Sequence, residues 1–133
     1  MKVIITDGGR AAAGYRGDAR DCVTRAIAIA TDIPYAEVYA ALSEAGGTSA
    51  REGVHRTTYE RYLQQRGWIF VPTMFIGSGC KVHMRDGELP GGRIIVRLSR
   101  HTCAVIDGVA HDTHDPTRGG TRCVYGYFQR RMA

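Results

Sequence analysis

Hydrophobic and polar positions in the first half of the chain alternate at helical intervals. A short apolar run at residues 3–5, stopped by Asp7-Gly8-Gly9, predicts a strand. Apolar or small side chains then recur three and four positions apart in three successive stretches, the spacing of a buried or amphipathic helix. These predicted helices cover residues 22–30, 34–46 and 54–66.

The second half of the chain changes to short runs of β-type residues separated by glycine and proline. The runs lie at residues 68–76, 80–84, 93–99, 102–107, 109–113 and 122–128. Asp107-Gly108 between two of them is a strong signal for a hairpin with a two-residue turn. Helices followed by strands predict an α+β domain, with N-terminal helices packed on a C-terminal antiparallel sheet. At 133 residues and 44% hydrophobic content, we expect a single domain over residues 1–133.

Composition narrows the function classes. The net charge is +5, and only two of the 18 basic residues are lysine. These residues are scattered, with Arg130-Arg131 as the one adjacent pair, which argues against nucleic acid as the main partner. The apolar runs are too short to cross a membrane, and we expect a cytoplasmic protein. The four cysteines are widely spaced, so we expect four reduced, unpaired thiols.

The predicted hairpin places several reactive side chains together. With Asp107 and Gly108 as the turn, alternate positions on the two strands share one face of the sheet. His101 and Asp112 become diagonal neighbours, roughly 7–8 Å apart at Cα, so that the carboxylate can orient the imidazole. Asp115 has the opposite parity and is the alternative acid if a bulge shifts the register. The predicted face carries His101, Cys103, Asp112 and His114.

Cys22 is the candidate nucleophile. Asp21 is predicted to cap the first helix with its carboxylate, which puts Cys22 at the first helical position. A helix N-terminus and a nearby imidazolium both lower the pKa of a thiol. If this helix packs on the face that carries His101, then Cys22, His101 and Asp112 form a Cys-His-Asp triad. The alternative for Cys22 is a small core residue, the commoner role of a lone cysteine on an apolar helix. Cys103 and Cys123 alternate with apolar strand residues and are predicted to be core.

The segments "DARDCVTRAIAIA" and "RIIVRLSRHTCAVIDGVAHDTHDP" resemble the papain-like cysteine peptidase superfamily, particularly compact bacteriocin-processing (C39-type) peptidase domains. The resemblance spans residues 21 to about 115. It implies a nucleophile at a helix start, a histidine on a strand and an acid on the next strand, with no metal or organic cofactor. The substrate would be a peptide, an isopeptide or another amide. Residues 13–18 read "AGYRGD" and lack the family's oxyanion glutamine, so Arg16 or a loop N–H would supply the donor beside the Cys22 N–H.

Two other interpretations compete with the triad. Cys80-x-x-His83 and His111-x-x-His114 contain Zn²⁺ ligands, although residues three apart on a strand point to opposite faces. The scaffold could also be a non-catalytic papain-like binding module that contacts proteins or nucleic acid through arginines such as Arg56, Arg61 and Arg66.

Overall fold

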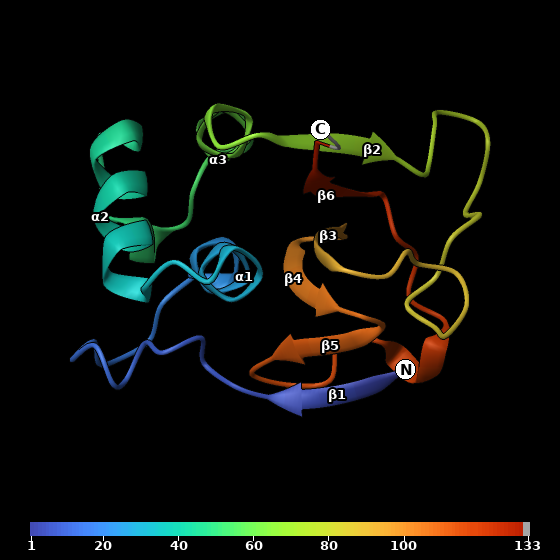
Figure 1. Ribbon diagram of the computed structural model, residues 1–133, viewed down its shortest axis with the longest axis horizontal. Helices are drawn as coiled ribbons and strands as arrows, with labels where there is room; N and C mark the ends of the chain where they lie inside the picture. Colours follow the sequence, from blue (N-terminus) through green and yellow to red (C-terminus); the bar gives the residue numbers. More distant parts are fainter. Residues whose placement is uncertain (132–133) are drawn as a thin grey trace.

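The computed structural model describes residues 1–131, in which three helices stand beside one six-stranded mixed sheet (Figure 1). The α+β class predicted from the sequence is therefore present. The elements in chain order are β1 (Lys2–Ile5), α1 (Cys22–Thr31), α2 (Tyr35–Gly46), α3 (Arg56–Gln65), β2 (Trp68–Pro72), β3 (Arg93–Leu98), β4 (His101–Ile106), β5 (Val109–Asp112) and β6 (Gly126–Arg130), with short 3-10 turns at Ala50–Glu52 and Arg118–Gly120.

The sheet has the strand order β1-β5-β4-β3-β6-β2. The prediction of a purely antiparallel, C-terminal sheet is wrong in one respect, because β1 joins the sheet edge parallel to β5. All three helices separate these two strands in the sequence, so no tight turn forces them to run in opposite directions. The β-type run at residues 80–84 contributes only an isolated bridge between His83 and Cys123.

The hairpin of β4 and β5 has the predicted register. Ile106 pairs with Val109 and Ala104 with His111. Asp107 and Gly108 both have positive φ values, 48° and 78°, as a type I′ turn requires. Local turn chemistry therefore fixes which residues of the two strands lie opposite each other.

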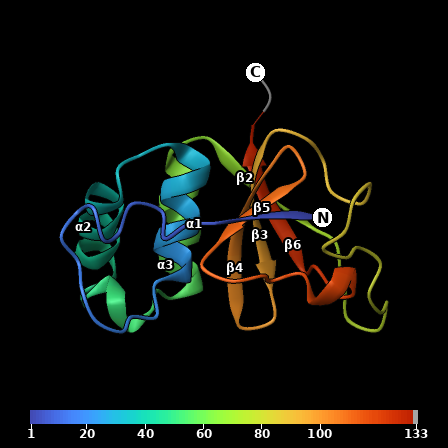
Figure 2. The same cartoon turned by 90° about the horizontal axis from the view of Figure 1, so that it is seen from below.

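Hydrophobic residues fill both faces of the sheet. One core joins the three helices to the face that carries Ile95, Ala104 and Phe128. Cys103 and Val105 belong to a second core on the other face. α1 lies between α2 and the sheet (Figures 1 and 2). α1 therefore covers the face opposite Cys103, while Cys22 at its first position interacts with His101 at the very start of β4.

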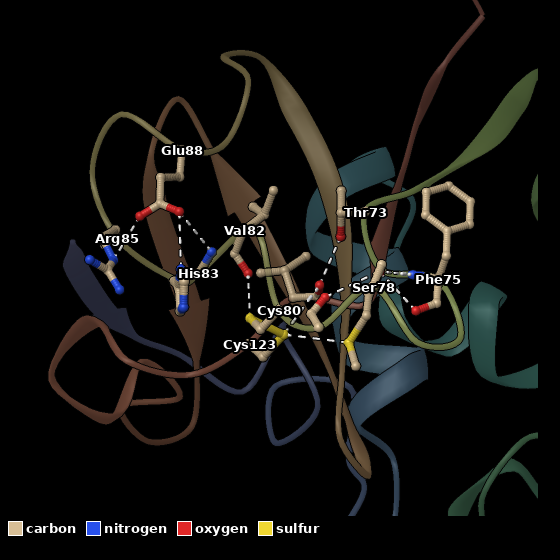
Figure 3. The surroundings of a disulfide bond; sticks show 12 residues. Thr73, Phe75, Ser78, Cys80, Val82, His83, Arg85, Glu88 and Cys123 are labelled. Atoms are coloured by element: carbon tan, nitrogen blue, oxygen red, sulfur yellow. Dashed lines mark hydrogen bonds and ion pairs between the residues drawn. A yellow bond between two sulfur atoms is a disulfide. The ribbon is translucent and has the colours of Figure 1, made fainter.

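Cys80 and Cys123 form a disulfide, which overturns the prediction of four unpaired thiols (Figure 3). Their Cα atoms lie 5.9 Å apart although 43 positions separate them in the sequence. The segment between β2 and β3 folds back along the residues before β6, with hydrogen bonds from the Val124 amide to the Val82 carbonyl and from the Met84 amide to the Arg122 carbonyl.

The disulfide also corrects the prediction that Cys123 is a core thiol, whereas Cys103 is buried as predicted. Sequence spacing could not reveal the bond, because a long-range chain reversal creates it. Disulfides persist mainly in oxidising environments, so this bond does not support the predicted cytoplasmic location, which stays a prediction.

Candidate active site

Cys22 is the first residue of α1 and is half-buried against the helix-side core. Asp21 occupies the N-cap position, but its carboxylate makes no capping hydrogen bond, contrary to the prediction. It accepts a hydrogen bond from the Tyr35 hydroxyl at 2.7 Å and pairs with Arg25 instead. Arg25 and the Tyr35 hydroxyl thus engage both oxygens of the buried carboxylate, Oδ1 and Oδ2.

His101 and Asp112 are in direct contact. They are the first residue of β4 and the last of β5, two adjacent antiparallel strands. Nε2 of His101 lies 2.5 Å from Oδ2 of Asp112, and their side chains are 10% and 3% exposed. The other carboxylate oxygen, Oδ1, accepts a hydrogen bond from the Thr113 amide at 2.7 Å. This contact engages Nε2 and leaves Nδ1 as the second nitrogen of the imidazole.

Cys22 and His101 shift each other's pKa. Burial acts to raise the pKa of Cys22, but hydrogen bonding and charge from His101, helped by the Thr102 amide and Arg25, outweigh it and lower the pKa. Burial acts to lower the pKa of His101, but Asp112 and Cys22 raise it to about 9. Both shifts favour a thiolate beside an imidazolium.

Asp112 is suited to hold that imidazolium. Burial acts to raise the pKa of its carboxyl group, but contact with His101 and the Thr113 amide hold the pKa below its usual range. Asp115, the alternative acid, is exposed and accepts hydrogen bonds from the amide and hydroxyl of Thr117 at 2.8 and 2.7 Å. Asp112 is therefore the acid that contacts His101, and Asp115 stabilises a turn.

The candidate oxyanion donors occupy different environments. The first hydrogen bond of α1 runs from the Arg25 amide to the Asp21 carbonyl. The Cys22 amide therefore belongs to the first turn, whose N–H groups have no partner within the helix. Arg16 is exposed, and its carbonyl accepts hydrogen bonds from Arg10 and Arg51, both at 3.1 Å. These bonds hold the backbone of the loop before α1 and leave the Arg16 side chain facing solvent.

The predicted zinc pairs do not assemble. The disulfide engages Cys80, and Nδ1 of His83 lies 3.1 Å from a carboxylate oxygen of Glu88 (Figure 3). His111 pairs with Ala104, whereas His114 lies beside His101 with 5.1 Å between ring centroids. A different set of ligand atoms, from His101, Asp112 and His114, lies within 4.8 Å of one another. Strand parity alone puts these three residues on one hairpin face, but no short ligand-spacing motif joins them in the sequence.

Arg25 is a neighbour of the site that the sequence reasoning missed. Its Nη2 atom lies 3.5 Å from Oδ1 of Asp112, and its Nη1 atom pairs with Asp21 one helical turn earlier. The four-residue spacing of Asp21 and Arg25 was a readable signal for an ion pair on a helix. The link to Asp112 depends on how α1 docks against β5, which the spacing does not encode.

This chain matches no protein-family model, no curated protein and no solved structure. Across residues 1–131, every helix is too short or too polar to cross a membrane.

Proposed function

We propose that this chain is a papain-like cysteine peptidase or amide hydrolase that acts through a covalent acyl-enzyme on Cys22. The observation that carries the proposal is the arrangement of Cys22, His101 and Asp112, hereafter the candidate triad. A half-buried thiol at a helix start and an imidazole held by a buried carboxylate shift each other's pKa toward a thiolate and an imidazolium. Nucleophile, base and orienting group in this order are the elements of thiol acyl transfer.

The acylation step follows from the protonation states. The Cys22 thiolate attacks the carbonyl carbon of the amide, and the carbonyl oxygen becomes an oxyanion that the Cys22 amide can stabilise. The C–N bond then breaks as the His101 imidazolium donates its proton to the leaving amine. The products of this half-reaction are a thioester on Cys22, a free amine and a neutral His101.

Hydrolysis of the thioester restores the enzyme. His101 removes a proton from water, and the hydroxide attacks the thioester carbonyl. The C–S bond breaks, which releases a carboxylic acid and returns the thiolate–imidazolium pair. Asp112 stabilises the imidazolium in both half-reactions and fixes the tautomer of the neutral ring. The steps require a peptide, an isopeptide or another amide and no cofactor.

Site-selective alkylation tests the proposal without a known substrate. Iodoacetamide at pH 6 is expected to alkylate Cys22 at least about tenfold faster than an unperturbed thiol, because an ordinary cysteine is almost entirely protonated there. Free glutathione at the same pH is the reference for an unperturbed thiol, and Cys22→Ser is the control that removes the labelled site. Mass spectrometry after p-nitrophenyl acetate treatment is expected to show an acetyl group on Cys22. Alkylation of Cys22 that His101→Ala leaves unchanged would contradict the proposal.

One observation favours a second candidate, a transition-metal site at His101, Asp112 and His114. Imidazole and carboxylate ligands suit Zn²⁺, and their ligand atoms lie within 4.8 Å of one another. Against it, Asp112 already contacts His101 and lies 3.5 Å from the cationic Arg25. On the hydrolase proposal, a chelator leaves both the melting temperature and the labelling of Cys22 unchanged. A metal site predicts one equivalent of zinc in the purified protein and a lower melting temperature after chelation.

A further inference from the structure

A buried chain of charges lies behind the candidate triad. The Arg25 guanidinium lies between two carboxylates, with Nη1 paired to Oδ1 of Asp21 and Nη2 3.5 Å from Oδ1 of Asp112. The side chains of Arg25, Asp21 and Asp112 are 12%, 3% and 3% exposed. One guanidinium therefore connects the residue before Cys22 to the residue that holds His101.

Asp21 is fixed from its other side as well. Its Oδ2 atom accepts a hydrogen bond from the Tyr35 hydroxyl at 2.7 Å and lies 3.5 Å from Nε of Arg10. Burial, followed by contact with Asp21, raises the pKa of Tyr35 far above its usual value, so the hydroxyl keeps its proton and remains a donor. The Tyr35 ring in turn packs edge-on against Tyr15.

Such a network is costly unless it is complete, because a buried carboxylate that loses its partner keeps its full desolvation cost. Without Arg25, Asp21 would keep Arg10 and Tyr35, but Asp112 would lose its only arginine contact within residues 1–131. The negative charge of Asp21 and Asp112 that Arg25 no longer offsets would also disfavour the Cys22 thiolate.

We propose that Arg25 is a positioning residue of the candidate active site, which anchors the Asp112 carboxylate against His101 and ties the hairpin to the start of α1 through Asp21. The inference deepens the proposed function and rests on it. Arg25 touches no reacting atom in the proposed steps and acts through the residues that do.

The proposal predicts an effect of Arg25 on the titration of Cys22. Arg25 is among the groups that lower the pKa of this thiol, after His101 and the Thr102 amide. Loss of its charge should therefore raise the pKa of Cys22. The titratable and charged groups that face this assembly from α1, α2, the hairpin, the loop before α1 and the segment before β6 are Arg10, Asp21, Arg25, Tyr35, His101, Cys103, Asp112, His114 and Arg122.

The experiment is the pH profile of Cys22 alkylation by iodoacetamide in folded protein. In Arg25→Gln the midpoint is expected to move upward by about 0.5–1 pH unit, a three- to tenfold slower reaction on the acid side of the profile. Arg25→Lys keeps the charge but loses the fork that reaches two carboxylates, so we expect a smaller upward shift. Asp21→Asn removes a negative charge beside Cys22 and is expected to shift the midpoint downward.

Arg97→Gln is the matched control. Arg97 also makes a partly buried ion pair, with Glu60 at 2.9 Å, and its side chain is 11% exposed, but it contacts α3 rather than the candidate triad. This variant should lose stability and keep the wild-type profile. If Arg25→Gln does not fold, Arg25→Lys provides the same test.

The outcomes separate the two proposals. A folded Arg25 variant whose profile coincides with that of the wild type would overturn the positioning role. A wild-type Cys22 that titrates like an ordinary thiol would instead overturn the proposed function. Equal shifts in Arg25→Gln and Arg97→Gln would show a general effect of lost stability, which also overturns the positioning role.

Discussion

Nε2 of His101 contacts Oδ2 of Asp112 at 2.5 Å, whereas the carboxylate of Asp115 accepts its hydrogen bonds from Thr117. The two acids lie three positions apart in the sequence and have different environments. Asp112 is buried between two strands, and Asp115 is exposed in the turn that follows. The hairpin register determines which of them reaches the imidazole.

Asp112→Asn is therefore expected to slow acylation of Cys22, and Asp115→Asn is not. An amide lacks the negative charge that stabilises the imidazolium, and its NH₂ group can hold the neutral ring in the wrong tautomer. Loss of the acid costs on the order of 10⁴ in a serine triad, and we expect about 10–100-fold here because a thiol is easier to activate. The measurement is the rate of Cys22 acylation by p-nitrophenyl acetate, with folding checked by a thermal melt. A slow Asp115→Asn beside an unaffected Asp112→Asn would reverse the assignment.

The same contact makes stability depend on pH. The pKa of His101 is raised from 6.5 to about 9 in the folded protein, despite burial, by Asp112 and Cys22. The stabilisation from this shift is fully present below about pH 6.5, the unfolded pKa, and is lost as the pH rises through the folded value. The pKa of Asp112 is lowered in the folded protein, so its contribution to stability acts in the opposite direction. That contribution is present above about pH 4 and is lost as the pH falls through the folded pKa.

The free energy of unfolding should therefore separate the wild type from Asp112→Asn most strongly near pH 5–6. We expect a difference on the order of 1–2 kcal/mol there and a smaller one at pH 9.5. Urea titrations at both pH values measure it, with Cys22→Ala in both proteins so that the thiol does not titrate. Cys22 is one of the groups that raise the pKa of His101, so without it this pKa is raised less. The loss of the stability difference should therefore be complete by pH 9.5. A difference that is independent of pH would rule out the ionised His101–Asp112 pair.

The contact between His101 and Asp112 could be predicted because it depends on local chemistry. Asp107-Gly108 supplies two consecutive positive φ angles, and that turn fixes the register of the strands on either side. The start of α1 at Cys22 was also readable, since periodic apolar positions begin there. Each of these features is encoded within about a dozen neighbouring residues.

Features that depend on distant residues could not be predicted in the same way. The local sequence predicts that the Asp21 carboxylate caps α1, but in the folded chain this carboxylate contacts Tyr35 and Arg10 instead. The Cys80–Cys123 disulfide likewise requires a chain reversal over 43 positions. Cys103 shares the parity of His101, yet it lies in the core on the far side of the sheet from α1.

A close approach between two strands predicts the effect of a small substitution at Gly126. A methyl group added there would lie 2.2 Å from Cζ of Phe70 and 2.9 Å from the Val71 carbonyl oxygen. Gly126→Ala must therefore displace an aromatic ring in a packed region, at a cost of about 1–3 kcal/mol. Gly91→Ala is the control, because its nearest contact would be Oδ1 of Asp107 at 3.6 Å and its φ is not positive. Equal melting temperatures for the two variants would contradict the close approach.

The disulfide predicts a stability that depends on redox conditions. Cys80–Cys123 joins the segment after β2 to the residues before β6, and it leaves Cys22 and Cys103 as free thiols (Figure 3). In the chain-entropy model a closed loop of this length stabilises the fold by about 3–4 kcal/mol. Cys80→Ser/Cys123→Ser, or the wild type in dithiothreitol, should therefore melt at a lower temperature.

Thiol titration in denaturant checks the bond directly, with two reactive thiols expected in the non-reduced wild type and four after reduction. Four thiols before reduction, with a melting temperature that dithiothreitol leaves unchanged, would show that the bond is absent. The double variant is expected to keep the fast alkylation of Cys22, because the contacts of the candidate triad come from α1, β4 and β5 and include neither bonded cysteine. A double variant that folds but alkylates slowly would show that the disulfide-linked segment also supports the site.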